Sequence, residues 1–314
     1  MPSLKQSVIR SFAHYLDKTV LYTMNRRVPE SLEASSADAP TFETVVAQTA
    51  VNLTKTPEYT LSAPGKHRIW LHGYVGELNC EVQVRPARDP NAPLLIYHHG
   101  LSEIPYDGSF RRLFPKSKPH STHLVCIQAP YHDSLTAPFS QGFSSIAHIY
   151  QMFAGSLRMM ELMQNHFEQQ GAAYTILAGI SWGGITSMLY EGLFRRTTAV
   201  IPMLSSPNLA QVMMDSADMF KRPLTLPPRT LQQFLDFTPY YEKCDFDCIF
   251  PLLGELDLFF QYQNHEHIFA ESNLSTTPYG HLTGIFDPNP IRSHVNDVLQ
   301  KVAQRLERTG QSNK

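Results

Sequence analysis

This sequence has few cysteines and tryptophans, and it has no large excess of acidic or basic residues. The 314 residues include four cysteines and two tryptophans, and 28 acidic residues nearly balance 26 basic ones. The formal net charge of −2 gives no electrostatic case for nucleic-acid binding by the whole molecule. The hydrophobic fraction of 42% is ordinary for a globular protein, so the chain can bury a large core.

The few cysteines indicate buried thiols and no metal site. Cys80 and Cys126 lie in apolar, strand-like runs, where a thiol behaves as a small hydrophobe. Cys244 and Cys248 form a single C-x-x-x-C pair without a histidine at ligand spacing, whereas a structural zinc site takes four ligands. We therefore expect reduced thiols and no bound metal.

Long hydrophobic runs are absent as well. No stretch approaches the roughly 20 apolar residues that cross a bilayer. The N-terminus has no compact apolar core followed by a small-residue cleavage site, which a secretory signal would contain. The sequence therefore predicts a soluble, cytoplasmic protein.

The first 66 residues predict a helix followed by an extended segment. Apolar residues recur at helical spacing over residues 1–29, and basic residues accompany them. One interpretation is a helix docked on the main domain, and the other is contact with a membrane surface or a partner. A stretch rich in Ser, Ala and Pro follows, through Pro40. The apolar positions of the helix are Leu4, Val8, Phe12, Tyr15, Leu16 and Val20.

Residues 67–314 predict one α/β domain, because apolar runs of strand length alternate with helical stretches. The later runs are continuously apolar, as expected for parallel strands covered on both faces. Long amphipathic helices are expected over residues 145–170, with Gly171 ending the first, and over 290–308. The candidate strands are 67–74, 77–84, 93–97, 123–128, 174–178, 199–204 and 248–253.

A G-x-S-x-G motif at Gly179-Ile180-Ser181-Trp182-Gly183 carries the main functional signal. An apolar strand runs directly into it, and a helical sequence follows. A serine hydroxyl is a weak nucleophile that must be presented to a base in a fixed orientation. A sharp strand-to-helix turn does so, and its close backbone contacts admit only small residues at the two glycine positions. The turn also aims the Trp182 amide at a developing oxyanion. A Gly-rich turn without catalytic meaning is the alternative.

Upstream of the serine, the strand before His98-His99-Gly100-Leu101 ends where a second oxyanion donor is needed. The amide of Leu101 is the candidate, and Gly100 permits close approach of the backbone to a substrate. Because His98 and His99 precede the serine, we expect them to brace this loop and not to act as bases. A simple strand-ending turn is the alternative interpretation.

A carboxylate and a histidine follow the serine in the order that completes a triad. Asp257 follows a strand and a Gly turn, where an acid can fix the tautomer of a histidine, and Glu255 in the same turn is its competitor. His281 follows Gly280 in a late loop and is the candidate base. The rivals His265 and His267 lie in a polar stretch that is more typical of a solvated helix face.

Taken together, these motifs resemble the α/β-hydrolase superfamily from residue 67 to the C-terminus. The resemblance implies an eight-stranded, mostly parallel sheet flanked by helices, with no cofactor and an acyl-enzyme mechanism. It implies that Ser181 attacks, His281 takes the proton, Asp257 orients the imidazole, and the amides of Trp182 and Leu101 hold the oxyanion. The single glycine after His99 departs from the glycine run of many esterases, and no subfamily follows.

Residues 207–243, which we name the cap, exceed an ordinary crossover and are rich in Met and aromatic residues. They predict a small helical cap that shapes an apolar pocket, or one that fills only its own core. We therefore expect a small-molecule ester or related acyl substrate with apolar groups. The alternatives are a thioesterase, an amidase or peptidase, an acyltransferase, or a catalytically silent binding protein on the same fold. The sequence leaves the oligomeric state open.

Overall fold

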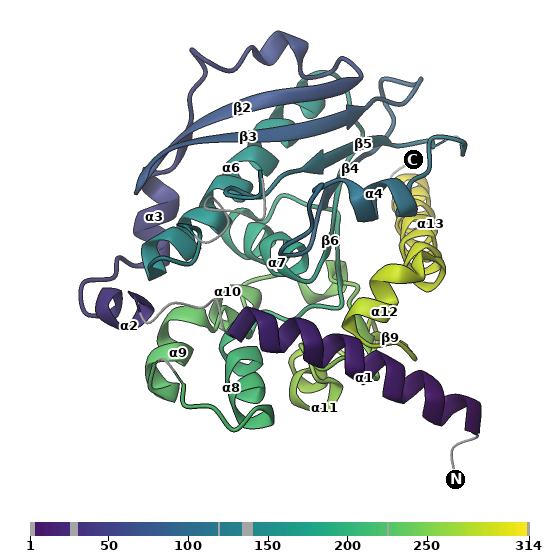
Figure 1. The fold of residues 1–314 in the computed structure, drawn as a ribbon. Helices are drawn as coiled ribbons and strands as arrows, with labels where there is room; N and C mark the ends of the chain where they lie inside the picture. The colour runs from purple at the N-terminus through teal and green to yellow at the C-terminus, as the bar shows by residue number, and fades with distance from the viewer. Residues whose placement is uncertain (1–3, 26–30, 119, 134–140, 225, 313–314) are drawn as a thin grey trace.

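The structure is a computed structural model that describes residues 4–25, 31–118, 120–133, 141–224 and 226–312. Its centre is one nine-stranded sheet (Figure 1). The strands are β1 (Ala50–Val51), β2 (Gly65–Gly73), β3 (Gly76–Arg85), β4 (Leu94–His98), β5 (His123–Ile127), β6 (Thr175–Ile180), β7 (Ala199–Met203), β8 (Leu252–Gly254) and β9 (Ser275–Thr277).

The strand order is β1-β2-β3-β5-β4-β6-β7-β8-β9. The pairs β1–β2, β2–β3 and β3–β5 are antiparallel, and β2 and β3 form a hairpin. The remaining pairs are parallel. The sheet has one strand more than expected. Ala50 pairs with His72, so the sheet begins before residue 67. Strands as short as β1 and β9 lack an apolar run that would mark them in the sequence.

Helices cover both faces of the sheet, and the central strands are therefore buried along their whole length. On one face pack α3 (Phe42–Gln48), α6 (Ile146–Gln169) and α7 (Trp182–Phe194), and on the other α4 (Gly108–Leu113) and α13 (Pro288–Ser312). The Ser145 side chain accepts the N–H of His148 and starts α6, and Gly171 follows its end with a φ of +103°.

A third group of helices contains α1 (Leu4–Asn25) and the cap helices and occupies the lower part of the view in Figure 1. The short helix α12 (His281–Phe286) lies between α1 and α13 and contacts both. Helix α1 also contacts α8. The cap contains α8 (Leu209–Met219), α9 (Pro228–Leu235) and α10 (Thr238–Tyr241). The remaining helices within the described ranges are α2 (Ser31–Ser36), α11 (Tyr262–His265) and the short 3₁₀ turns Glu58–Thr60, Phe246–Cys248 and Glu266–Ile268.

All four cysteines are free and buried, as expected. No group of three or more His, Cys, Asp or Glu side chains in the described ranges is arranged to hold a metal ion. Every helix in these ranges is too short or too polar to cross a bilayer.

The helix α1 is docked on the domain, with Ala13, Asp17 and Leu21 buried. Its opposite side leaves Val8, Phe12 and other large apolar side chains exposed. Residues 1–3 and 26–30, which include the basic residues Arg26 and Arg27, lie outside the described residues. Contact of this helix with a membrane therefore stays a prediction.

Candidate active site

Ser181 occupies a strained turn between β6 and α7. Its φ of 54° and ψ of −117° are unfavourable for a residue with a side chain, and such strain is typical of functional turns. The two flanking glycines are required by space. A Cβ on Gly179 would lie 2.6 Å from the Gly184 nitrogen, and a Cβ on Gly183 would lie 2.8 Å from the His99 carbonyl oxygen. The turn therefore forms only with glycine at both positions.

Ser181, His281 and Asp257 form a continuous hydrogen-bonded chain. The Ser181 Oγ lies 3.0 Å from His281 Nε2, and His281 Nδ1 lies 2.8 Å from Asp257 Oδ2. Asp257 follows β8 and His281 follows β9, so neighbouring parallel strands bring the two loops to one sheet edge. All three residues are buried, which strengthens the electrostatic interaction between them.

The Asp257 carboxylate is held rigidly on its other side. Its Oδ1 accepts the backbone N–H groups of Phe259 at 2.7 Å and Phe260 at 3.0 Å. The Phe259 ring stacks on the His281 imidazole, with ring centroids 4.2 Å apart. The competitor Glu255 is exposed, and its carboxylate accepts the Thr276 hydroxyl instead.

Opposing effects set the pKa of His281. Burial by itself lowers this pKa, but the charge of Asp257, its hydrogen bond and the charge of Asp17 together raise it above the ordinary value of about 6.5. With Asp257 as acceptor, Nδ1 carries the proton, so Nε2 of the neutral ring faces the serine as an acceptor. This is the arrangement that a general base requires.

The candidate oxyanion donors Trp182 and Leu101 both line the cavity that contains Ser181. Among the described residues, neither of these two amide N–H groups donates to a protein acceptor. The loop that carries Leu101 is braced by Glu103, which accepts the N–H of Gly100 at 3.4 Å and the Ser109 hydroxyl at 2.8 Å. Two unused donors therefore lie beside the serine.

His98 and His99 brace this loop, as the sequence predicts. His98 contacts the Ser156 hydroxyl, and His99 Nε2 accepts the N–H of Ala129 at 2.9 Å. Burial lowers the pKa of His98 to about 4 and also lowers the pKa of His99, so both rings are neutral. Neither ring contacts Ser181.

One prediction about the rival histidines is wrong. His265 is fully buried and does not lie on a solvated helix face, whereas His267 is exposed. The His265 Nδ1 contacts the Ser206 hydroxyl at 2.9 Å, and burial lowers its pKa to about 4. Its ring packs against Phe260, with ring centroids 5.5 Å apart, whereas the neighbouring Gln263 is exposed.

Sequence reasoning missed Asp17, which enters the site from α1. The side chain is fully buried and accepts the backbone N–H groups of His281 at 2.9 Å, Leu282 at 2.9 Å and Leu258 at 3.1 Å. A signal was present, since Ala13, Asp17 and Leu21 share one helix face at intervals of four residues. A lone carboxylate on a buried face needs donors from elsewhere in the fold.

Two small apolar cavities adjoin each other, and Ser181 lines the first of them. The first, of about 90 Å³, is lined by Ser181 and His281 together with apolar side chains from α1, α7, α8 and α12. The second, of about 80 Å³, extends from Trp182 toward the cap and the N-terminal segment. Both are lined by Leu101, Trp182, Leu209, Val212 and Phe259.

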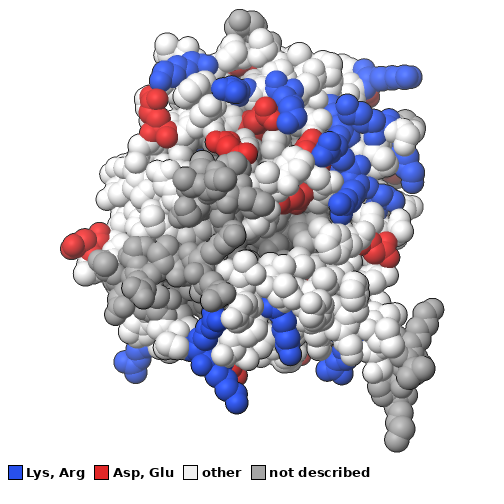
Figure 2. Space-filling model, viewed as in Figure 1, with Lys and Arg blue, Asp and Glu red and all other residues white. Residues whose placement is uncertain are grey.

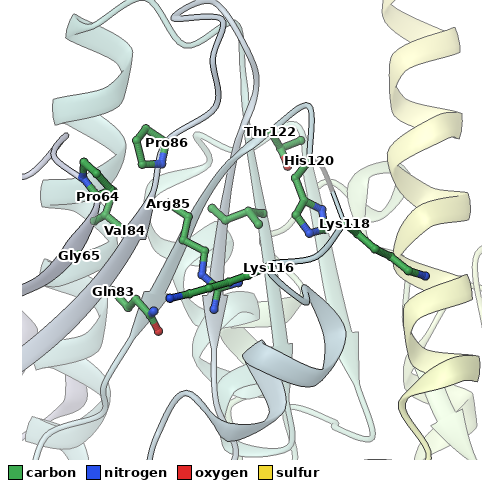
Figure 3. A pocket seen from close by; sticks show the side chains of 11 residues that line it. Pro64, Gly65, Gln83, Val84, Arg85, Pro86, Lys116, Lys118, His120 and Thr122 are labelled. Carbon is green, nitrogen blue, oxygen red and sulfur yellow. The ribbon is translucent and has the colours of Figure 1, made fainter.

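A larger hollow lies elsewhere, beside the carboxyl end of β3 and the amino end of β5. Lys and Arg side chains gather at the upper right of the view in Figure 2, over the region of α4 and β5. Arg85, Lys116 and Lys118 line the hollow of about 530 Å³ drawn in Figure 3. Its lining includes neither a serine nor a carboxylate, so it is separate from the chain of residues around Ser181.

Comparisons with known proteins support the fold. No protein-family model and no curated protein matches this sequence. The structure is similar to acetyl xylan esterase 1 from Thermoanaerobacterium sp. JW/SL YS485, with a TM-score of 0.52 and 14% identity over 81% of this chain and 89% of that one. It is also similar to Est1E from Butyrivibrio proteoclasticus, solved with ferulic acid bound (TM-score 0.51, 12% identity, 72% and 96% covered).

A third similar structure is a thermostable carboxyl esterase from Bacillus coagulans, with a TM-score of 0.51 and 11% identity over 77% of this chain and 98% of that one. Identities this low establish the fold and not the activity. The chain has the α/β-hydrolase fold, as the resemblance in its sequence predicts.

Proposed function

We propose that this α/β-hydrolase-fold chain is a serine hydrolase that cleaves a carboxylic ester through an acyl-enzyme on Ser181. The observation that carries the proposal is the buried chain from Ser181 through His281 to Asp257, with contacts of 3.0 and 2.8 Å. A strained turn presents the serine to an apolar cavity, and a second apolar cavity adjoins the first. Nucleophile, base and orienting acid thus have the relative positions that acyl transfer requires.

In the first step, the Ser181 Oγ attacks the ester carbonyl carbon while His281 Nε2 accepts the hydroxyl proton. Asp257 stabilises the imidazolium that forms. The tetrahedral intermediate then expels the alcohol, which takes the proton from Nε2, and the acyl group remains on Ser181. In the second step water attacks the acyl-enzyme by the same route, releasing the carboxylic acid and regenerating the serine.

The negative charge that develops on the carbonyl oxygen is bound by the amides of Trp182 and Leu101 in this proposal. Trp182 is the first residue of α7, so the positive end of that helix adds to the stabilisation. Nucleophile, base and oxyanion donors all come from the chain, and we propose no cofactor.

The cavities favour apolar substrate groups on both sides of the reacting carbonyl. The acyl chain and the alcohol would each enter one cavity, and the cap supplies Leu209 and Val212 to both of them. Burial of one methylene group is worth about 0.8 kcal/mol, which corresponds to about a fourfold gain in kcat/KM per carbon.

Because butyrate has two more methylene groups than acetate, we expect kcat/KM for p-nitrophenyl butyrate to exceed that for the acetate by about 15-fold, with the gain ending when the small cavity is full. The measurement is a series of p-nitrophenyl esters of increasing acyl length at one pH. Highest activity on charged short substrates, with none on butyrate, would show that the cap does not shape an apolar pocket.

The activity should rise with pH, because only neutral His281 accepts the serine proton. The raised pKa of His281 places the midpoint of kcat/KM above about pH 6.5, with loss of activity as the imidazole becomes protonated below it. A profile measured between about pH 5 and pH 9 tests this. A midpoint clearly below pH 6 would contradict the proposed pairing of His281 with the two carboxylates.

Hydrolysis of p-nitrophenyl butyrate by the purified chain and by Ser181→Ala tests the proposed function directly. We expect turnover by the parent and none above the background rate by the variant. Ser187→Ala is a matched control, because Ser187 is also buried in α7 but bonds to the Gly183 carbonyl. Equal turnover by the parent and Ser181→Ala would refute the proposal.

A further inference from the structure

Asp17 is the only acidic residue of α1, and it is fully buried at the point where the two catalytic loops meet. It is 240 or more positions from the residues that it contacts, since its partners are Leu258, His281 and Leu282. A buried carboxylate is costly unless hydrogen bonds satisfy it. Here three backbone N–H groups do so, and all three belong to the loops that carry Asp257 and His281.

The two oxygens of Asp17 have different roles. Oδ2 accepts the N–H of Leu258 at 3.1 Å and the N–H of His281 at 2.9 Å, so a single atom joins the two loops. Oδ1 accepts the N–H of Leu282 at 2.9 Å. The distance between the backbones of the acid and the base is therefore fixed from a third element.

The packing around Gly280 shows how closely α1 approaches. A Cβ on Gly280 would lie 2.9 Å from Asp17 Oδ2 and 3.1 Å from the Ala13 Cβ. Gly280 is also the residue before α12, where a side chain commonly accepts the first N–H groups of a helix. Because glycine has no side chain, Asp17 supplies that acceptor from α1.

We propose that Asp17 is a positioning residue, which holds His281 against Asp257 and Ser181 and adds a second negative charge beside the imidazolium. This inference rests on the proposed function, because it assigns Asp17 to the same reaction. It makes α1 a part of the active site. Asp17 contacts no substrate in this mechanism. It acts on His281 through the hydrogen bond to the His281 backbone and through the electrostatic effect of its own negative charge.

The charges around Asp17 agree with this role. The titratable groups that face it are His281, Asp257 and, on its own helix, His14. Burial and then the charge of Asp257 raise the pKa of Asp17, whereas His281 and the backbone donors lower it. The charge of Asp17 in turn raises the pKa of His281. Removing that charge should therefore lower the pKa of the base.

The test compares Asp17→Asn with the parent in two measurements. The first is the pKa of His281 by ¹⁵N-edited NMR, with its signal among the 14 histidines identified by its absence in His281→Gln. The second is the rate at which a fluorophosphonate modifies Ser181. In Asp17→Asn the amide nitrogen replaces one acceptor, so at least one backbone N–H faces a donor.

Glu191→Gln is the matched control. Glu191 is also buried, and its carboxylate accepts the backbone N–H of Thr197 at 3.0 Å, but it lies at the far end of α7 from Ser181. The same carboxylate-to-amide change at Glu191 should lower stability without changing the pKa of His281. Asp17→Glu restores the charge and should recover part of the rate and the raised pKa of His281.

We expect Asp17→Asn to lower the pKa of His281 and to slow modification of Ser181 on the order of tenfold to a hundredfold, with Glu191→Gln unchanged in both. A parent-like pKa and rate in Asp17→Asn would overturn the inference, as would equal effects in Glu191→Gln. A parent that a fluorophosphonate does not modify would instead refute the proposed function, while the pKa of His281 would still report on Asp17.

Discussion

Replacing His281 with alanine is expected to lower kcat for ester hydrolysis by about 10⁵- to 10⁶-fold, close to the loss from Ser181→Ala. Without the imidazole, no described side chain contacts the Ser181 hydroxyl to accept its proton. Asp257→Asn is expected to cost about 10⁴-fold, because an amide favours the wrong tautomer of the histidine. The three changes should not add, since the residues act as one unit.

This prediction has two controls, which are the same substitution at the rival histidine His267 and a measurement of whether each variant is folded. His267→Ala removes an exposed imidazole from the same C-terminal region and should leave kcat within about twofold of the parent. Melting temperatures show whether each variant is folded. A loss in His267→Ala as large as in His281→Ala, or a kcat for His281→Ala within tenfold of the parent, would contradict the assigned base.

Gly183→Ala is expected to have the largest effect on the fold. The added Cβ would overlap the carbonyl of His98 and lie 2.8 Å from that of His99. Neither backbone group can rotate away as a side chain does, so the serine turn and the loop of Leu101 would have to separate. Overpacking usually costs about 1 to 3 kcal/mol, and a backbone clash lies at or above the upper end. We expect a clear loss of melting temperature and of turnover.

Gly100→Ala is the matched control for stability. The nearest heavy atoms to its added Cβ lie at 3.6 Å, which is ordinary contact, so its melting temperature should stay close to that of the parent. Differential scanning calorimetry on the two variants makes the comparison. If Gly183→Ala melts at the parental temperature, then the close approach of the serine turn to His98 and His99 is not required for folding.

The candidate site was predictable from the sequence where its chemistry depends on local geometry. The serine turn requires glycine on both sides, and this requirement leaves a short readable motif around Ser181. Asp257 follows a glycine at the end of a predicted strand and His281 follows a glycine in a late loop, so their order along the chain indicated a triad. The fold then brings together residues that are 100 positions apart.

The contribution of α1 was not predicted, because the spacing that places Asp17 on one face with Ala13 and Leu21 does not show which residues that face contacts. Its three donors are backbone N–H groups, which leave no mark in the sequence. The burial of His265 was missed for a similar reason, since its partner Ser206 is 59 positions earlier. Such pairs depend on tertiary packing and not on spacing.

Reaction of the parent with a fluorophosphonate, followed by intact mass and peptide mapping, tests the central claim most directly. We predict one covalent adduct, located on Ser181, which is absent from Ser181→Ala and strongly reduced in His281→Ala. A folded parent that acquires no adduct, or that carries it on another residue, would contradict the assignment of Ser181 as an activated nucleophile.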